Sequence, residues 1–110
     1  MVLKYYTSTS QRSPVEEFIL DQSESVQQEI LDALVLLEDG KSLSMPLSRP
    51  LPGIHRGLHE LRFKDKRGQV RIVYFFKKGD AIYFLHAFRK KTRTMSKKDK
   101  NLILKRLKEI

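Results

Sequence analysis

Alternating and helical patterns of apolar residues divide the first half of the chain into three predicted elements. Strand-forming residues without a helical period predict a first strand at 2–7. A helix is predicted to begin at Pro14, with Ser13 as its N-cap. Apolar residues then recur at helical spacing up to Gly40, so a second helix is predicted to begin near residues 23–25.

The second half of the chain has a different pattern. Residues 41–57 hold three of the four prolines, which predicts a loop that crosses the domain. Three apolar stretches at 58–64, 70–77 and 81–88 are separated by short turns, which predicts an antiparallel meander. Ser96 then caps a predicted C-terminal helix.

The predicted order is therefore β-α-α-β-β-β-α, an α+β fold in one domain over residues 1–110. We expect an antiparallel sheet with the helices packed on one face. Strand alternation places Arg62 and Lys64 on the other face, and Arg71 follows on the next strand. Burying a polar group without a partner costs roughly 2–7 kcal/mol, and an unpaired charge in an apolar strand costs at least several kcal/mol. These residues therefore predict a cationic, solvent-accessible concavity.

The charge of the chain supports a polyanionic partner. The net charge is +9, and it is uneven: residues 1–53 carry four basic and eight acidic side chains, whereas residues 89–110 carry ten and two. Such a field favours RNA, DNA or anionic lipid, although solubility or an acidic protein partner would also explain it. The chain has no cysteine, which excludes disulfide and thiol chemistry. No signal peptide or membrane span is recognisable, so a cytoplasmic protein without membrane association is the default expectation.

The basic residues form a candidate site for a phosphodiester. Arg62, Lys64 and Arg71 share neighbouring strands, and further cations leave the last strand at its end: Arg89, Lys90 and Lys91. Arginine can hold two phosphate oxygens, and preorganised cations can stabilise the charge that develops when RNA is cleaved through its 2′-hydroxyl. The alternative for Arg71 is a simple pairing with Glu60 across the strands.

Further basic residues, together with Arg89, are candidates for contacts with RNA. Arg93, Lys97 and Lys98 follow the last strand, in the stretch that leads into the C-terminal helix. A solvated helix face is the alternative for the lysines.

Histidine is the other candidate for chemistry. His86 lies in a predicted strand with Phe84 and Phe88 on the same side, so it is either a buried histidine or a general acid or base. The three histidines lack metal-ligand spacing and a convincing carboxylate companion, so we reject a zinc site and expect no cofactor.

Three motifs together resemble a known superfamily. "GLHELRF", "GQVRIVYFF" and "LHAFRKKT", followed by the Ser-capped helix, are similar to the HigB/RelE toxins of type II toxin–antitoxin systems. More narrowly, they resemble the phage-derived, host-inhibition (HigB-type) branch. The resemblance covers roughly residues 2–110 and implies a RelE-like fold.

The resemblance also implies an activity and partners. RelE-type toxins are ribosome-dependent mRNA endoribonucleases (mRNA interferases) that inhibit translation. They cleave through the 2′-hydroxyl and need no metal. Expected partners are the ribosome, mRNA and a cognate helix-turn-helix antitoxin (HigA-like), which neutralises the toxin in a hetero-oligomeric complex.

The family pattern can be carried over residue by residue. The basic pair of the first meander strand matches Arg62 and Lys64, and the arginine opening the next strand matches Arg71. The basic pair after the last strand matches Lys90 and Lys91, which would stabilise the phosphate.

One departure concerns the general base. Relatives often place a tyrosine near the start of the last segment, but "RTMSKKDK" has none. His86 or a lysine would therefore have to serve as the base. A ParE-type gyrase-poisoning toxin and a non-catalytic RNA- or ribosome-binding module are the alternatives, and Arg62 and Lys64 argue against the ParE type.

Overall fold

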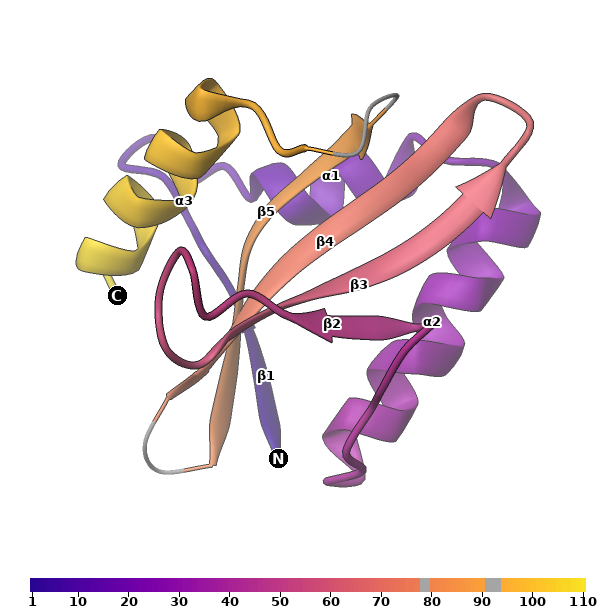
Figure 1. Cartoon of the computed structure of the whole chain (residues 1–110), viewed down its shortest axis with the longest axis horizontal. Coiled ribbons are helices and arrows are strands. Elements are labelled where there is room, and N and C mark those ends of the chain that lie inside the picture. Colours follow the sequence, from indigo (N-terminus) through magenta and orange to yellow (C-terminus); the bar gives the residue numbers. More distant parts are fainter. Residues whose placement is uncertain (78–79, 91–93) are drawn as a thin grey trace.

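The computed structural model describes residues 1–77, 80–90 and 94–110 (Figure 1). Within these residues the chain forms a five-stranded sheet and three helices, which confirms the α+β class. None of the described helices is both long enough and apolar enough to cross a membrane. The elements in chain order are β1 (Val2–Tyr5), α1 (Pro14–Leu20), α2 (Glu24–Glu38), β2 (Ser48–Pro50), β3 (Leu58–Asp65), β4 (Gly68–Lys77), β5 (Ala81–Lys90) and α3 (Lys97–Lys108).

The strand order in the sheet is β1-β5-β4-β3-β2. The predicted antiparallel meander is confirmed as β3, β4 and β5. β1 adds to the outer edge of β5 in parallel, with Val2 opposite Ala81, so the sheet is not purely antiparallel. Sequence analysis missed β2, which lies inside the predicted loop and pairs with β3. β2 reaches only as far as the register pair Ser48–Leu61. Beyond it, one backbone hydrogen bond, from Arg62 N to Leu47 O, reaches the edge of β3 among the described residues, which otherwise leave this edge open.

Serine caps set the starts of two helices. The side chains of Ser23 and Ser96 accept hydrogen bonds from the backbone N–H groups of Val26 and Asp99, at 3.3 and 3.1 Å. These bonds satisfy N–H groups that have no partner within the helix. Ser13 stands before α1 as predicted, but its side chain makes no capping hydrogen bond.

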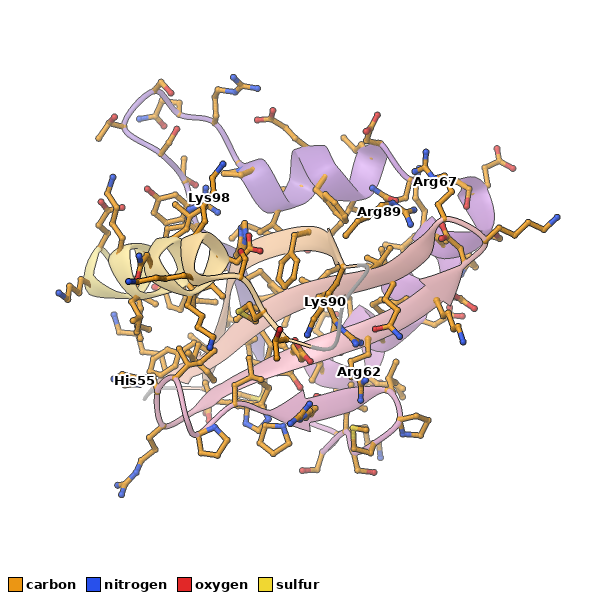
Figure 2. All side chains as sticks on the ribbon, turned by 45° about the horizontal axis from the view of Figure 1, so that its top comes forward. His55, Arg62, Arg67, Arg89, Lys90 and Lys98 are labelled. Atoms are coloured by element: carbon orange, nitrogen blue, oxygen red, sulfur yellow. The ribbon has the colours of Figure 1, made fainter. Side chains whose placement is uncertain are left out.

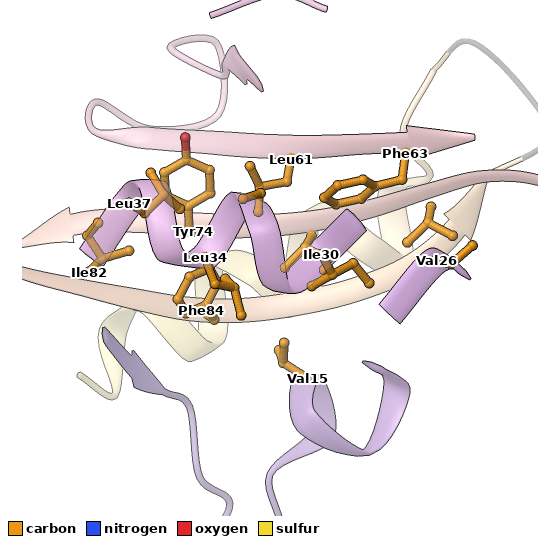
Figure 3. Packing of buried hydrophobic residues seen from close by; sticks show 13 residues of the cluster. Val15, Val26, Ile30, Leu34, Leu37, Leu61, Phe63, Tyr74, Ile82 and Phe84 are labelled. Carbon is orange, nitrogen blue, oxygen red and sulfur yellow. The ribbon is translucent and has the colours of Figure 1, made fainter. Parts of the chain in front are cut away.

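Helices α1 and α2 pack on one face of the sheet, as predicted. The α2 stripe of Ile30, Leu34 and Leu37 packs on apolar side chains from the strands (Figure 3). The strand residues of this cluster include Leu61, Phe63, Val70, Ile72, Tyr74, Ile82 and Phe84. They follow the period of two expected for one face of a pleated sheet.

Helix α3 belongs to a second cluster. Its Ile103 is fully buried and packs with Leu58, Val73 and Leu85. These strand residues alternate with those under α1 and α2, so α3 covers part of the opposite face. The remainder of that face carries the basic residues of β3 and β4.

Candidate functional site: a basic cluster on the sheet

Two arginines and one glutamate form the centre of the candidate site. Arg62 of β3 and Arg71 of β4 lie directly opposite each other in the strand register. Like charges at opposed positions destabilise a sheet. The Oε1 atom of Glu60 lies 3.9 Å from the Nε atom of Arg62 and 3.8 Å from that of Arg71. Glu60 is 2% exposed and Arg71 is 4% exposed, so a buried carboxylate is shared between the two guanidinium groups.

Two further cations surround the same carboxylate. Arg49 of β2 is the register partner of Glu60, and Lys90 ends β5 on the far side of β4. Burial lowers the pKa of Lys90, and Arg71, Arg49 and Arg62 lower it further, against the opposing effect of Glu60. We call Arg49, Arg62, Arg71 and Lys90, together with Glu60, the basic cluster. Its positive charge exceeds what one carboxylate can compensate.

Burial also perturbs Arg71 itself. Desolvation lowers the pKa of its guanidinium; Glu60 acts in the opposite direction, and Arg62 and Arg49 lower the pKa further. Arg71 donates to the side-chain oxygen of Gln69. Among the described residues, the buried Nε atoms of Arg62 and Arg71 have no hydrogen-bonding partner. Unsatisfied charged donors are costly, so stability alone does not explain this arrangement, whereas an anion would compensate the charge.

A cavity of about 540 Å³ gives access to the cluster. It lies where α2 approaches the open edge of β3, and Arg62, Lys64 and Arg71 form part of its wall. The side chain of Arg62 also contacts Met45, with 3.1 Å between Nη1 and Sδ. A ligand in this cavity would lie against the arginines of the basic cluster.

The structure brings together four residues predicted from the sequence. Arg62, Arg71 and Lys90 belong to the basic cluster, and the exposed Lys64 lines the adjoining cavity. Figure 2 shows Arg62 and Lys90 over the central strands. The alternative for Arg71, a pairing with Glu60, also holds, because the shared carboxylate is part of the cluster. Two other predicted residues, Lys91 and Arg93, lie outside the described residues.

Arg89 is directed away from the cluster. Its guanidinium donates to both carboxylate oxygens of Asp65, at 2.8 and 2.7 Å, and to Gln22 at 2.7 Å. The hydrogen bonds from Arg89 are the main reason that the pKa of Asp65 falls to about 2. Arg89 therefore connects β5 to the β3–β4 turn and to the α1–α2 connection, and Figure 2 shows it beside Arg67.

His86 connects β5 to α3. Its Nε2 atom lies 2.7 Å from Oδ1 of Asp99, and its Nδ1 atom lies 3.3 Å from Nη1 of Arg106. Burial lowers the pKa of His86, and Asp99 opposes this shift. A neutral ring that donates from Nε2 and accepts at Nδ1 satisfies both contacts. Asp99 is the carboxylate companion that sequence analysis did not find, but no group of three or more potential metal ligands occurs within the described ranges.

The α3 lysines lie apart from the cluster. Lys97 and Lys98 are exposed in the first turn of the helix, and Figure 2 shows Lys98 well away from Arg62. Their placement is compatible with an additional contact surface and equally with a solvated helix face.

Sequence analysis missed two members of the cluster. Arg49 lies between prolines in the segment predicted as a loop, and only the pairing of β2 with β3 brings it beside Glu60. Glu60 entered the prediction only as a possible partner of Arg71. The signal that could have identified it is a carboxylate within an apolar strand, on the same face as Arg62.

The family comparison matches most of the chain. The family described as "Phage derived protein Gp49-like (DUF891)" matches residues 17–108. The chain belongs to this Gp49-like family. The family is phage-derived and associated with the toxins of toxin–antitoxin systems. No curated protein matches the chain. The matched region of this Gp49-like protein includes the whole basic cluster and the His86–Asp99 pair.

Proposed function

We propose that this Gp49-like protein is a HigB-type toxin that cleaves mRNA on the ribosome. The observation that carries the proposal is the basic cluster, in which cations from four strands, β2 to β5, surround one buried carboxylate beside an open cavity. Its excess positive charge suits the phosphodiester of a nucleic acid. Membership of a toxin-like family supports this proposal over a general RNA-binding role.

The proposed reaction needs no metal or other cofactor. The 2′-oxygen attacks the neighbouring phosphorus while the bond from phosphorus to the 5′-oxygen breaks. A base takes the proton of the 2′-hydroxyl, and an acid gives a proton to the leaving 5′-oxygen. Arg62 and Arg71 would hold the non-bridging oxygens and stabilise the charge that develops on them.

Lys90 is a better candidate than His86 for proton transfer at this site. Both ring nitrogens of His86 are engaged by α3 residues. Lys90 belongs to the cluster, and burial and its cationic neighbours lower its pKa. A lysine with a lowered pKa transfers protons more readily near neutral pH.

The proposal includes partners. The ribosome and mRNA would meet the basic cluster, and Lys97 and Lys98 would add contacts to ribosomal RNA. A cognate helix-turn-helix antitoxin would neutralise the toxin in a hetero-oligomeric complex, and its co-expression should restore growth.

Induced expression in a bacterial host tests the proposal. We expect growth arrest and, by primer extension, new 5′ ends within translated codons. Arg71→Met should abolish the new ends, because it removes a cluster charge. Arg67→Met is the matched control, because Arg67 is exposed at the β3–β4 turn.

Other results would contradict the proposal. Growth arrest with intact mRNA and damaged DNA would indicate a gyrase-poisoning toxin of the ParE type. Soluble protein without arrest would indicate a binding module. If the chain binds RNA through several phosphates, its affinity should fall steeply with salt, and a flat response would exclude polyanion binding.

A further inference from the structure

The cavity beside the basic cluster has a second wall of opposite charge. Glu29 and Asp32 project from α2 into the same cavity that Arg62, Lys64 and Arg71 line. Among the described residues, no ion pair joins either carboxylate to those cations. The two carboxylates therefore do not serve to neutralise the arginines.

These carboxylates are unsuited to the phosphate itself. A carboxylate repels a phosphate but accepts hydrogen bonds from N–H donors. In single-stranded RNA such donors lie on the base edges, which are free to be read. A nucleotide presents both chemistries, with an anionic phosphate at one end and base N–H groups at the other.

The apolar part of the cavity lining suits the face of a base. Ala33 and Leu36 of α2, with Pro46 and Phe63, line the cavity together with its acidic and basic residues. The volume of about 540 Å³ is within the usual range for small-molecule sites, roughly 300–1,000 Å³. Arg71 also lines this cavity, and only 4% of its surface is exposed. Within the described residues, its Nε atom has no hydrogen-bonding partner.

We propose that this cavity is a base-selective subsite that prefers guanine next to the cleaved phosphate. The inference rests on the proposed function, because it places the phosphate at the basic cluster. Guanine carries N1–H and the N2 amino group side by side, so one carboxylate can accept from both. Glu29 supplies this acceptor. Asp32 supplies a second, held in place by Gln28, whose amide donates to its Oδ1 atom at 2.9 Å.

The other bases fit this wall less well. Uracil has one N–H between two carbonyl oxygens, which a carboxylate repels. Adenine and cytosine present an amino group next to a ring nitrogen that has a lone pair. One bidentate pairing with the correct base typically discriminates by about fivefold to 150-fold.

Binding of non-cleavable RNA tests the inference separately from catalysis. The probes are short 2′-O-methyl strands of sequence UUXUU, in which X is each of the four bases, and the readout is fluorescence anisotropy. We expect the strand with guanine to bind about tenfold more tightly than the strand with uracil. Glu29→Gln combined with Asp32→Asn should reduce this preference to near unity while leaving the affinity for UUUUU unchanged or higher.

Controls separate this subsite from the phosphate site. Glu24→Gln removes an exposed carboxylate from the first turn of α2, outside the cavity, and should leave the preference unchanged. Arg71→Met should weaken all four strands alike. Absence of cleavage by the wild-type protein, with its base preference present, would contradict the proposed reaction and leave the subsite standing.

Three results would overturn the inference. They are equal affinity for all four strands, a preference for uracil, or a guanine preference that survives the double substitution. If the double substitution leaves RNA binding unchanged but weakens a co-purified protein partner, the cavity is a protein-docking groove.

Discussion

Replacing Glu60 with glutamine removes the charge from the middle of the basic cluster while keeping the volume of the side chain. The carboxylate is buried and lies 3.9 and 3.8 Å from the Nε atoms of Arg62 and Arg71. Glutamine can still form hydrogen bonds, so the substitution isolates the electrostatic contribution. We expect Glu60→Gln to fold but to be markedly less stable.

The magnitude follows from these two contacts. At such distances and an effective dielectric constant of about 20, each pair contributes about 4 kcal/mol of Coulomb attraction. The desolvation of the carboxylate offsets part of this sum. Removing one partner of a buried ion pair usually costs about 3–5 kcal/mol, because the other charge stays buried without compensation. We therefore expect Glu60→Gln to lower the free energy of unfolding by about 3–5 kcal/mol.

Urea unfolding of four proteins measures this effect. They are the wild type, Glu60→Gln, Arg71→Met and the double variant. A fifth protein, Glu24→Gln, serves as an exposed control. Arg71→Met should be neutral or stabilising, because it removes a desolvated cation that faces Arg62. Consequently, the double variant should be less destabilised than Glu60→Gln alone.

An added anion provides an independent check. Inorganic phosphate should stabilise Glu60→Gln more than the wild type, because a bound anion replaces the missing carboxylate. A loss below about 1 kcal/mol for Glu60→Gln, with no phosphate effect, would refute the view that Glu60 compensates the cluster.

Three further predictions concern other groups. The pKa of Asp65 is about 2 in the folded protein, against an ordinary 3.8. The stability from its pairing with Arg89 is therefore present above pH 3.8 and is lost as the pH falls through about 2. Urea titrations at several pH values should show that Asp65→Asn reduces this loss of stability in acid. The pKa of Lys90 is lowered below the ordinary 10.5, so RNA affinity should fall as the pH rises through that lowered pKa. Lys90→Arg should shift this fall in affinity to higher pH. If the variant leaves the dependence of RNA affinity on pH unchanged, Lys90 is not part of the binding surface. Ile103→Ala should cost about 2–5 kcal/mol by calorimetry, because it opens a void under α3, whereas Leu20→Ala at an exposed position should change stability by less than about 0.5 kcal/mol.

Local patterns predicted most of the secondary structure, because they depend on neighbouring residues. The meander strands have apolar stretches between turn residues, and Ser23 and Ser96 are standard N-caps. β2 could not be predicted in this way. It is a three-residue strand that ends in Pro50, too short to show alternation, and it forms because β3 offers an edge with which it can pair.

The parts of the site that alternation defines were also predictable. Arg62 and Lys64 share a face of one strand, and Arg71 follows on the next. The predicted end of the last strand at Phe88 was too early, since β5 runs to Lys90. Because the strand continues to Lys90, successive side chains still alternate between the two faces of the sheet. Arg89 therefore lies on the face of α1, and Lys90 lies on the face of the basic cluster.

Long-range pairing set the remainder of the site. Arg49 reaches Glu60 only through the β2–β3 register, and His86 meets Asp99 and Arg106 only after α3 packs on the sheet. Such contacts depend on where separate elements lie in space. A single sequence contains no local signal for them.

The parallel pairing of β1 with β5 has a consequence for the order of folding. β1 is made first, but its only strand neighbour within the described sheet is β5, which is made after all the other strands. Closing so long a loop is slow, because chain entropy is lost before any pairing compensates for it. Lys90, the last member of the basic cluster, lies on that same strand. During synthesis, the cluster is therefore completed only when the chain becomes able to close its sheet, so a partly made chain would be neither fully folded nor fully basic at this site.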